Sequence, residues 1–227
     1  MSSGKDVAVV LVSGGMDSAV VAALACREHE AAFLHLDYGQ RTEVKERSCF
    51  EALADYFGVS KRLIARVDPL GSIGGSSLTD RSLPLSESRR GASVIPTTYV
   101  PFRNTHFLAA AVSWGEVLGA KWIFYGAVEE DSSGYPDCRE SYLEAFNRLI
   151  EEGTRPETRL RVIAPLLHRN KGEIVREGVR VGAPFQLTWS CYGESERACG
   201  ECESCLLRMK GFREAGYQDP IPYRIRV

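Results

Sequence analysis

The sequence predicts an α/β protein with a doubly wound parallel sheet, followed by a cysteine-rich C-terminal segment. Short apolar runs alternate with segments of helical periodicity along most of the 227 residues. The first apolar run ends in a Ser-Gly-Gly turn at residues 13–15, a common junction between a strand and a helix. Four of the seven cysteines fall between Cys191 and Cys205. These three observations predict a sheet domain with a separate cysteine segment after it.

The first three strands are expected to alternate with two helices. VAVVLVS at 7–13 is rich in β-branched residues and predicts a fully buried strand. An alanine-rich helix is expected from Asp17 to residue 29. AAFLHLDYG at 31–39 predicts the second strand, and the apolar residues of 41–59 recur at helical spacing. KRLIARV at 61–67 predicts the third strand.

A long insertion is expected after the third strand. Residues 68–100 are rich in Gly, Ser, Pro and Thr, a composition typical of loops. A loop of this length inside a compact domain is usually functional or disordered. A helix at 103–118 and a fourth strand, KWIFYGAV at 121–128, are expected to follow it.

The remaining elements repeat the alternation. A loop with Gly and Pro at 129–140 leads into a helix expected at about 141–150. RLRVIAPLL at 159–167 predicts a fifth strand, and NKGEIVREGVRVG predicts a short helix that ends at Gly182.

This alternation has a consequence for the position of a ligand. Strands joined through helices form a parallel sheet covered on both faces, and its ligands bind beyond the carboxyl ends of the strands. Residues 13–15, 37–40 and 126–130 each follow a predicted strand. We therefore expect these three segments to face one crevice.

The composition is that of a soluble globular protein, with 44% hydrophobic and 26% charged residues. The formal net charge of −2 argues against a surface that binds nucleic acid directly or a membrane. No cationic start is followed by an apolar signal core, and no apolar run is long enough to span a bilayer, so the cytoplasm is the expected compartment. An odd number of cysteines in such a chain disfavours a disulfide framework.

The first turn has the features of an anion site. Two glycines let the backbone approach a ligand closely, and the N–H groups of Gly14 and Gly15 precede the amino end of a helix. The hydroxyls of Ser13 and Ser18 lie in the same stretch. The Walker ending Gly-Lys-Ser/Thr is missing, and so are the three spaced glycines of a dinucleotide site. An ordinary strand-to-helix turn is the alternative.

Ser-Gly-Gly-x-Asp-Ser after a buried strand resembles the pyrophosphate loop, or PP-loop, of the ATP pyrophosphatase superfamily. Members of that superfamily have the adenine-nucleotide alpha-hydrolase-like fold, split ATP between the α and β phosphates, and transfer adenylate to an oxygen. The resemblance implies ATP and Mg²⁺ as cofactors. It implies nucleotide contacts from Val12, Ser13, Gly14, Gly15, Met16, Asp17, Ser18, Ala19, Val20, Val21 and Ala22.

Within this resemblance three residues receive more specific roles. Gly14, Gly15 and Ser18 would hold the pyrophosphate. Asp17 is placed near Mg²⁺ or as a helix cap, because a carboxylate repels phosphate. Lys171 in NKGEI matches a lysine that neutralises phosphate charge in such enzymes, and a solvated lysine at a helix start is the alternative.

The cysteine cluster predicts a metal site. Cys191, Cys199, Cys202 and Cys205 are separated by seven, two and two residues. Four thiolates at such spacing can close a tetrahedral Zn²⁺ site. An iron–sulfur cluster is the rival, although the Pro that follows the last ferredoxin cysteine is missing. Because the protein supplies all four ligands, the zinc is expected to be structural.

Five further segments narrow the resemblance. They are DYGQR at 37–41, SSLT at 76–79, VPFRN at 100–104, SGYPDCR at 133–139 and TWSCY…CGECESCLLR at 188–208. Together they are similar to the QueC family, the 7-cyano-7-deazaguanine synthases of queuosine and archaeosine precursor synthesis. The resemblance covers nearly the whole chain. It implies a PP-loop catalytic domain over 1–186 and a zinc-binding segment with a tail over 187–227.

The resemblance also implies the reaction. An ATP-dependent carbon–nitrogen ligase would convert 7-carboxy-7-deazaguanine and ammonia into 7-cyano-7-deazaguanine, through an adenylated carboxylate and an amide. The partners are then small molecules and no nucleic acid is bound directly. A homodimer is a family-level expectation.

Substrate contacts are assigned by chemistry. A carboxylate suits the two neighbouring N–H donors of a deazaguanine, and Asp131 and Asp137 are the candidates. Stacking on the ring is expected from Tyr38 or Tyr135. A two-pronged contact with the substrate carboxylate is expected from Arg103 or Arg139. Asn104 of VPFRN is a further substrate candidate, and Lys171, Asp17 and Arg103 are the catalytic candidates. For each of these residues a loop salt bridge or a surface position is the alternative.

Three residues depart from the family pattern. Thr42 stands where most members have His, and Met16 stands where the pyrophosphate loop often has Gln or Leu. Phe102 stands where most members have Gly, and we expect it to change the shape of the pocket. It is the hint for a different function, that of an enzyme that attaches a deazaguanine to a protein amine. A tRNA thiolase of the same superfamily, with a reactive cysteine near the nucleotide, is a second competing hypothesis. A zinc-stabilised binding module without chemistry is a third.

Overall fold

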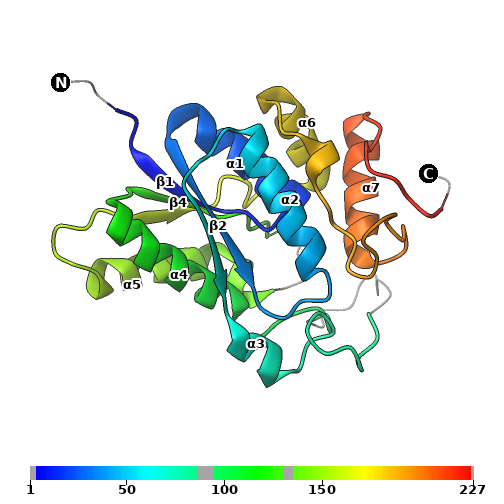
Figure 1. Ribbon diagram of the computed structural model, residues 1–227, viewed down its shortest axis with the longest axis horizontal. Helices are drawn as coiled ribbons and strands as arrows, with labels where there is room; N and C mark the ends of the chain where they lie inside the picture. Colours follow the sequence, from blue (N-terminus) through cyan, green and yellow to red (C-terminus); the bar gives the residue numbers. More distant parts are fainter. Residues whose placement is uncertain (1–3, 86–94, 130–134, 226–227) are drawn as a thin grey trace.

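The computed structural model describes residues 4–85, 95–129 and 135–225. Its centre is a five-stranded, entirely parallel sheet with the strand order β3-β2-β1-β4-β5 (Figure 1). The strands are β1 (Val7–Leu11), β2 (Glu30–Asp37), β3 (Arg62–Arg66), β4 (Trp122–Phe124) and β5 (Arg161–Ile163). The predicted doubly wound α/β fold is therefore confirmed.

Alternate residues of the strands supply two hydrophobic cores, one on each face of the sheet. Ala8 and Val10 pack with α1 (Met16–Glu28), α2 (Glu43–Tyr56) and α6 (Lys171–Val181). Val9 and Leu11 point the other way and pack with α4 (Arg103–Leu118) and α5 (Glu140–Gly153). The two groups of helices cover opposite faces of the sheet in Figure 1.

The order of the strands sets the position of the site. The chain runs outward from β1 to β3, then crosses the sheet and continues outward from β4 to β5. The carboxyl ends of β1 and β4 therefore form the point where the winding reverses, which is where parallel sheets bind ligands.

Strands β4 and β5 are shorter than predicted. The predicted strand at 121–128 is regular only over Trp122–Phe124. Beyond these residues the segments that follow β4 and β5 stay hydrogen-bonded to each other. Tyr125 N donates to Ile163 O at 2.9 Å, and Glu129 N donates to Leu167 O at 2.8 Å. The irregular ends turn backbone and side chains toward the crevice.

Two helices were not expected from the sequence. Helix α3 (Asp68–Ile73) lies in the predicted insertion, with Pro in its first turn. Helix α7 (Glu203–Ala215) follows directly on the cysteine run, where the metal spacing obscured the helical periodicity. Two short 3-10 turns, η1 (Pro136–Cys138) and η2 (Phe185–Leu187), complete the elements of the described residues.

The C-terminal segment packs against the sheet domain. Phe212 of α7 belongs to the same core as α1 and α6, and α7 lies along α6 (Figure 1). The cysteines lie in a smaller cluster with Trp189 and with Cys49 of α2. The boundary between 186 and 187 stays a prediction. None of the described helices combines the length and apolarity that crossing a lipid bilayer requires.

Candidate functional site

The turn after β1 approaches α2 so closely that only glycine fits at its first step. Gly14 has φ +84°, and a Cβ there would lie 2.7 Å from the carbonyl oxygen of Glu46 and 2.9 Å from Cys49 Cβ. Its own carbonyl accepts a hydrogen bond of 2.9 Å from Trp189 N. The turn is thus held between α2 and the C-terminal segment.

Helix α1 begins one residue earlier than predicted, and this changes the interpretation of Asp17. Gly15 is the N-cap residue, and no side chain caps the helix. Asp17 therefore lies inside the first turn, and the helix-cap alternative for it is wrong. The first N–H groups of α1 remain available for an anion, as the amino end of a helix favours.

The two serines of the turn support its shape. The Ser13 hydroxyl donates to Ser18 Oγ at 3.2 Å, and the Ser18 hydroxyl donates to the Gly15 carbonyl at 3.0 Å. Gly15 N donates to Ser13 Oγ at 3.3 Å. These bonds hold the hydroxyls and the amide beside the amino end of α1.

A cavity of about 310 Å³ opens at the carboxyl edge of the sheet. The three segments expected to share a crevice all contribute to its lining, through Ser13, Gly15, Tyr38, Gln40 and Gly126. The cavity is bounded on another side by the C-terminal segment, including Trp189.

The structure brings most of the predicted ligand-contacting residues to this cavity. Those in its lining are Val12, Ser13, Gly15, Met16, Asp17, Ser18, Tyr38, Arg103, Asn104, Tyr135 and Lys171. Gly14, predicted to hold the pyrophosphate, does not belong to the lining. Four other residues of the predicted nucleotide stretch are fully buried in the hydrophobic core beneath α1: Ala19, Val20, Val21 and Ala22. Asp131 lies outside the described residues.

Lys171 reaches the cavity from the first turn of α6. Its Nζ donates to Asp17 Oδ2 at 2.8 Å, and its side chain is 10% exposed. A capping box formed by Asn170 and Glu173 fixes the start of this helix. Asp17 Oδ1 is buried and accepts no hydrogen bond from the described residues. A carboxylate oxygen in this state suits a hard cation such as Mg²⁺.

Arg103 is the cavity's cation with unused hydrogen-bonding capacity. Its Nη1 donates to the Tyr38 hydroxyl at 3.3 Å, and its guanidinium carbon lies 5.7 Å from the ring centre of Tyr38 and 5.6 Å from that of Phe107. No ion pair among the described residues involves Arg103. Burial raises the pKa of Tyr38 to about 12, so its phenol stays protonated at neutral pH.

Asp137 and Arg139 do not line the cavity. Asp137 is 3% exposed, and its Oδ2 accepts the backbone N–H of Asn104 at 3.1 Å, while Asn104 Nδ2 donates to the Asp137 carbonyl at 3.2 Å. Asp137 therefore caps the first turn of α4 from a distant part of the chain. Arg139 is exposed and precedes α5.

The position of the Phe102 side chain also differs from what the sequence predicted. It is the N-cap residue of α4 with φ 59°, a left-handed conformation that favours glycine. Its side chain is 59% exposed and does not belong to the lining of the cavity. The expected change in pocket shape is therefore not seen, and the backbone conformation explains why Gly suits this position.

Several lining residues were not singled out from the sequence. They include Glu46, Tyr125, Tyr192 and Glu203. Gln40 was expected at the crevice only as part of the DYGQR segment, which follows a predicted strand. Glu46 carried no signal in the sequence, because its place depends on the contact of α2 with the turn after β1.

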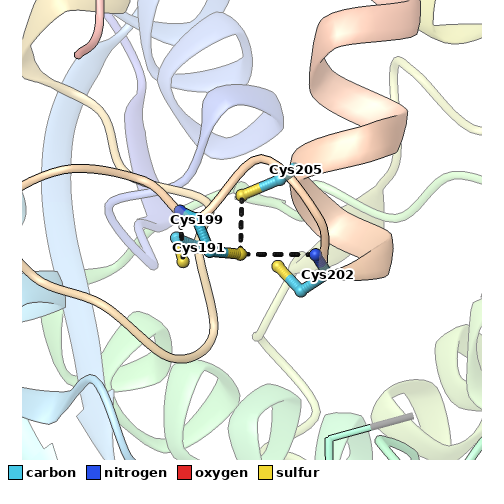
Figure 2. Close-up of side chains that lie close together, drawn as sticks. All are labelled: Cys191, Cys199, Cys202 and Cys205. Atoms are coloured by element: carbon cyan, nitrogen blue, oxygen red, sulfur yellow. Dashed lines mark hydrogen bonds between the residues drawn. The ribbon is translucent and has the colours of Figure 1, made fainter. Parts of the chain in front are cut away.

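The four cysteines converge on one point (Figure 2). Their sulfur atoms all lie within 4.8 Å of one another, and those of Cys199 and Cys205 are 3.8 Å apart. Tetrahedral zinc with Zn–S bonds of about 2.3 Å requires sulfur separations of ~3.8 Å. Backbone N–H groups of Cys199 and Cys202 donate to the sulfurs of Cys191 and Cys199. Donor type and spacing fit a single ion better than a multi-iron cluster, whose cysteines bind different iron atoms.

The protonation of the cluster is shared. The thiols of Cys202 and Cys205 donate hydrogen bonds to the Cys191 sulfur and hold the pKa of Cys191 far below its usual range. The contact with Cys191 raises the pKa of Cys202 to about 12. One sulfur is thus readily a thiolate, and the others lose their protons when a cation binds.

Fold and site together define an α/β protein with a Ser-Gly-Gly turn at the switch point of a parallel sheet and a C-terminal four-cysteine site. The family described as "Queuosine biosynthesis protein QueC" matches residues 7–216. The chain belongs to this family.

Two relatives of known name agree with this assignment. A protein of Chlorobium luteolum named "7-cyano-7-deazaguanine synthase" is 54% identical over 220 residues, which are 96% of this chain and 97% of that protein. One of the same name from Acidobacterium capsulatum is 54% identical over the full length of both chains. Among solved structures, an NAD+ synthetase of Burkholderia pseudomallei aligns with a TM-score of 0.46 and 13% identity, covering 98% of this chain and 70% of that chain.

Proposed function

We propose that the chain is an ATP-dependent 7-cyano-7-deazaguanine synthase that acts on 7-carboxy-7-deazaguanine and ammonia. The observation that carries the proposal is the cavity in which the turn after β1, the Lys171–Asp17 pair and Arg103 meet. It offers an anion site for the polyphosphate beside a cation for a substrate carboxylate. The names of the relatives at 54% identity support the same reaction.

The chemistry explains why an adenylating site would be needed. A carboxylate is a weak electrophile and its oxygen is a poor leaving group. Transfer of adenylate to that oxygen lets ammonia attack the carbon, so that the oxygen departs with AMP and an amide forms. The amide becomes a nitrile when its remaining oxygen is activated and leaves in turn. Positioning and charge stabilisation would supply most of the catalysis.

The nucleotide would bind with its phosphates at the turn after β1. The N–H of Gly15, the amino end of α1 and the hydroxyl of Ser18 would contact the pyrophosphate. Lys171 would neutralise the charge that develops on it during adenylate transfer. Asp17, with one buried oxygen lacking a hydrogen bond, would hold Mg²⁺, and the ion would supply positive charge to the polyphosphate.

The deazaguanine would occupy the part of the cavity near α4. Arg103 would bind its carboxylate, while Tyr38 or Tyr135 would stack on the ring. Asn104 lies next to them in the lining. Asp131 remains the candidate for the pairing edge of the base, since Asp137 is engaged in capping α4.

The thiolase and protein-amine hypotheses receive less support from the geometry. A thiolase needs a reactive cysteine at the nucleotide, but burial raises the pKa of Cys138, the cavity-lining thiol nearest Asn104. The protein-amine hypothesis depended on Phe102, whose side chain is exposed and outside the lining.

Product identification tests the proposal. Purified protein is incubated with 7-carboxy-7-deazaguanine, ammonium, Mg²⁺ and ATP, and mass spectrometry is expected to show the nitrile with release of pyrophosphate or phosphate. Omission of ammonium should stop the reaction before the amide. A binding module without chemistry would give no nitrile and would release no pyrophosphate or phosphate. The absence of the nitrile, or of this release, would refute the proposed enzymatic function.

A further inference from the structure

Helix α7 packs against Lys171, the lysine that lines the cavity. A Cβ on Gly211 would lie 2.8 Å from Lys171 Cβ and 3.0 Å from the Lys171 carbonyl oxygen. Only a hydrogen atom fits in this space, because contacts under 3.0 Å force one of the two backbones to move. The backbone of α7 thus packs directly on Lys171.

Two more contacts fix the same pair of helices. Arg176 Nη1 donates to the Glu214 carbonyl at 2.9 Å. A Cβ on Gly172, the residue after Lys171, would lie 2.9 Å from Glu214 Cβ. The first turn of α6 therefore packs closely on α7, and each helix contributes a glycine to the contact: Gly172 from α6 and Gly211 from α7.

The other end of α7 belongs to the four-cysteine site. Cys202 is the N-cap residue of the helix, and Cys205 lies in its first turn (Figure 2). One turn further, Arg208 is 1% exposed; it pairs with Asp219 at 2.8 Å and donates to Thr188 Oγ1 at 2.6 Å. The buried contacts of α7 thus run from the cysteines through Arg208 to Gly211.

We propose that Gly211 is a positioning residue for Lys171, through which helix α7 holds the lysine in place. The inference rests on the proposed function, in which Lys171 contacts the phosphates of ATP. Fixing the backbone of Lys171 keeps its Nζ at Asp17, beside the amino end of α1, before the nucleotide arrives. Such preorganisation increases the affinity for the nucleotide.

Gly211→Ala tests the inference, with Gly153→Ala as the matched control. Gly153 is also a helical glycine, but no heavy atom lies within 4 Å of a Cβ built there. Affinity for α,β-methylene-ATP with Mg²⁺ is measured by titration calorimetry, together with the zinc content. We expect G211A to bind the nucleotide about tenfold more weakly, as for loss of a charge-assisted contact. Affinity for 7-carboxy-7-deazaguanine and bound zinc should stay at wild-type values, and G153A should match the wild type.

A double mutant separates this inference from the proposed function. In a Lys171→Ala background, G211A should weaken nucleotide binding no further, because its effect passes through the lysine. If K171A itself left nucleotide affinity unchanged, the proposed role of Lys171 would be wrong. If K171A weakened binding and G211A did not, only the inference would be overturned.

A milder variant covers the case in which G211A fails to fold. Gly172→Ala introduces a methyl group against the side chain of Glu214 and separates the same two helices. A folded, zinc-loaded G172A protein with weakened nucleotide binding supports the inference. Unchanged binding in that protein contradicts it.

Discussion

Two arginines at the edge of the cavity differ in how much of their bonding capacity the fold already uses. Arg208 donates to both carboxylate oxygens of Asp219 and to Thr188, and it packs on the ring of Phe212. Arg103 contacts only the Tyr38 hydroxyl, its neighbour Asn104 and aromatic faces among the described residues. The first arginine is engaged in the structure, and the second is available to a ligand.

Arg103→Ala should therefore impair substrate binding selectively. We expect the KM for 7-carboxy-7-deazaguanine to rise by roughly 10- to 100-fold, the usual effect of losing a two-pronged contact with a carboxylate. The KM for ATP should change by less than about threefold, because Lys171 and the turn after β1 remain. Steady-state kinetics with each substrate varied in turn gives both values. An equal rise in both would show that Arg103 supports the cavity as a whole.

At the scale of single elements, the start of α4 carries a backbone conformation that its residue does not favour. Phe102 is the one residue other than glycine with a positive φ in the described part of the chain. A left-handed conformation costs such a residue about 1–2 kcal/mol, and the exposed ring recovers little of this by burial.

Phe102→Gly should stabilise the protein. We expect the free energy of unfolding to rise by about 0.5–1 kcal/mol, the relief of strain less the larger backbone entropy of glycine in the unfolded chain. Phe102→Ala is the matched variant and should give no gain, since alanine meets the same strain. Urea unfolding measures both. Catalysis should be unchanged in F102G. A large change in the KM for 7-carboxy-7-deazaguanine would show that Phe102 contributes to the binding site after all.

The elements also show what could be predicted from sequence. The strands and most helices were recognised because their apolar periodicity is local, and the turn after β1 was recognised from its glycines. The cap that Asp137 provides for α4 could not be foreseen, because it joins segments 33 positions apart. Helix α7 was missed for another reason: the cysteine spacing that predicted the metal site occupies its first turn.

For the whole molecule, buried groups with raised pKa values predict a loss of stability in alkali. Burial raises the pKa of Cys26 to about 11 and those of Tyr38 and Tyr142 to about 12, from ordinary values of 9.0 and 10.0. Between the two values the unfolded chain has lost these protons and the native chain has kept them. The contribution of these three groups to the free energy of unfolding should therefore be constant below about pH 9 and should fall from there to about pH 12.

Urea unfolding at a series of pH values measures this fall. Tyr38→Phe keeps the ring and removes the titrating hydroxyl, so the decline between about pH 10 and pH 12 should be less steep in this variant. An identical slope in both proteins would mean that Tyr38 ionises in the native state as it does in the unfolded chain.

Metal removal is the second test at this scale. Elemental analysis should find about one zinc per chain, bound by the four cysteines. Chelation should lower the apparent Tm by roughly 10 °C, because the metal anchors α7 and the segment around it. Added zinc should restore it. Iron in the purified protein would refute the zinc assignment.

The C-terminal residues 219–224 fold back onto the segment that carries the cysteines and bind to it through hydrogen bonds and an ion pair. Ala198 N donates to the Pro222 carbonyl at 2.9 Å, Arg224 N donates to the Ala198 carbonyl at 2.8 Å, and Asp219 neutralises buried Arg208. A premature stop codon ahead of Asp219 would therefore remove far more than a surface tail. It would leave a buried guanidinium without its counter-charge in the middle of α7, the helix that carries Cys205 and has Cys202 as its N-cap residue. Even a short deletion at this end should therefore yield protein that cells degrade.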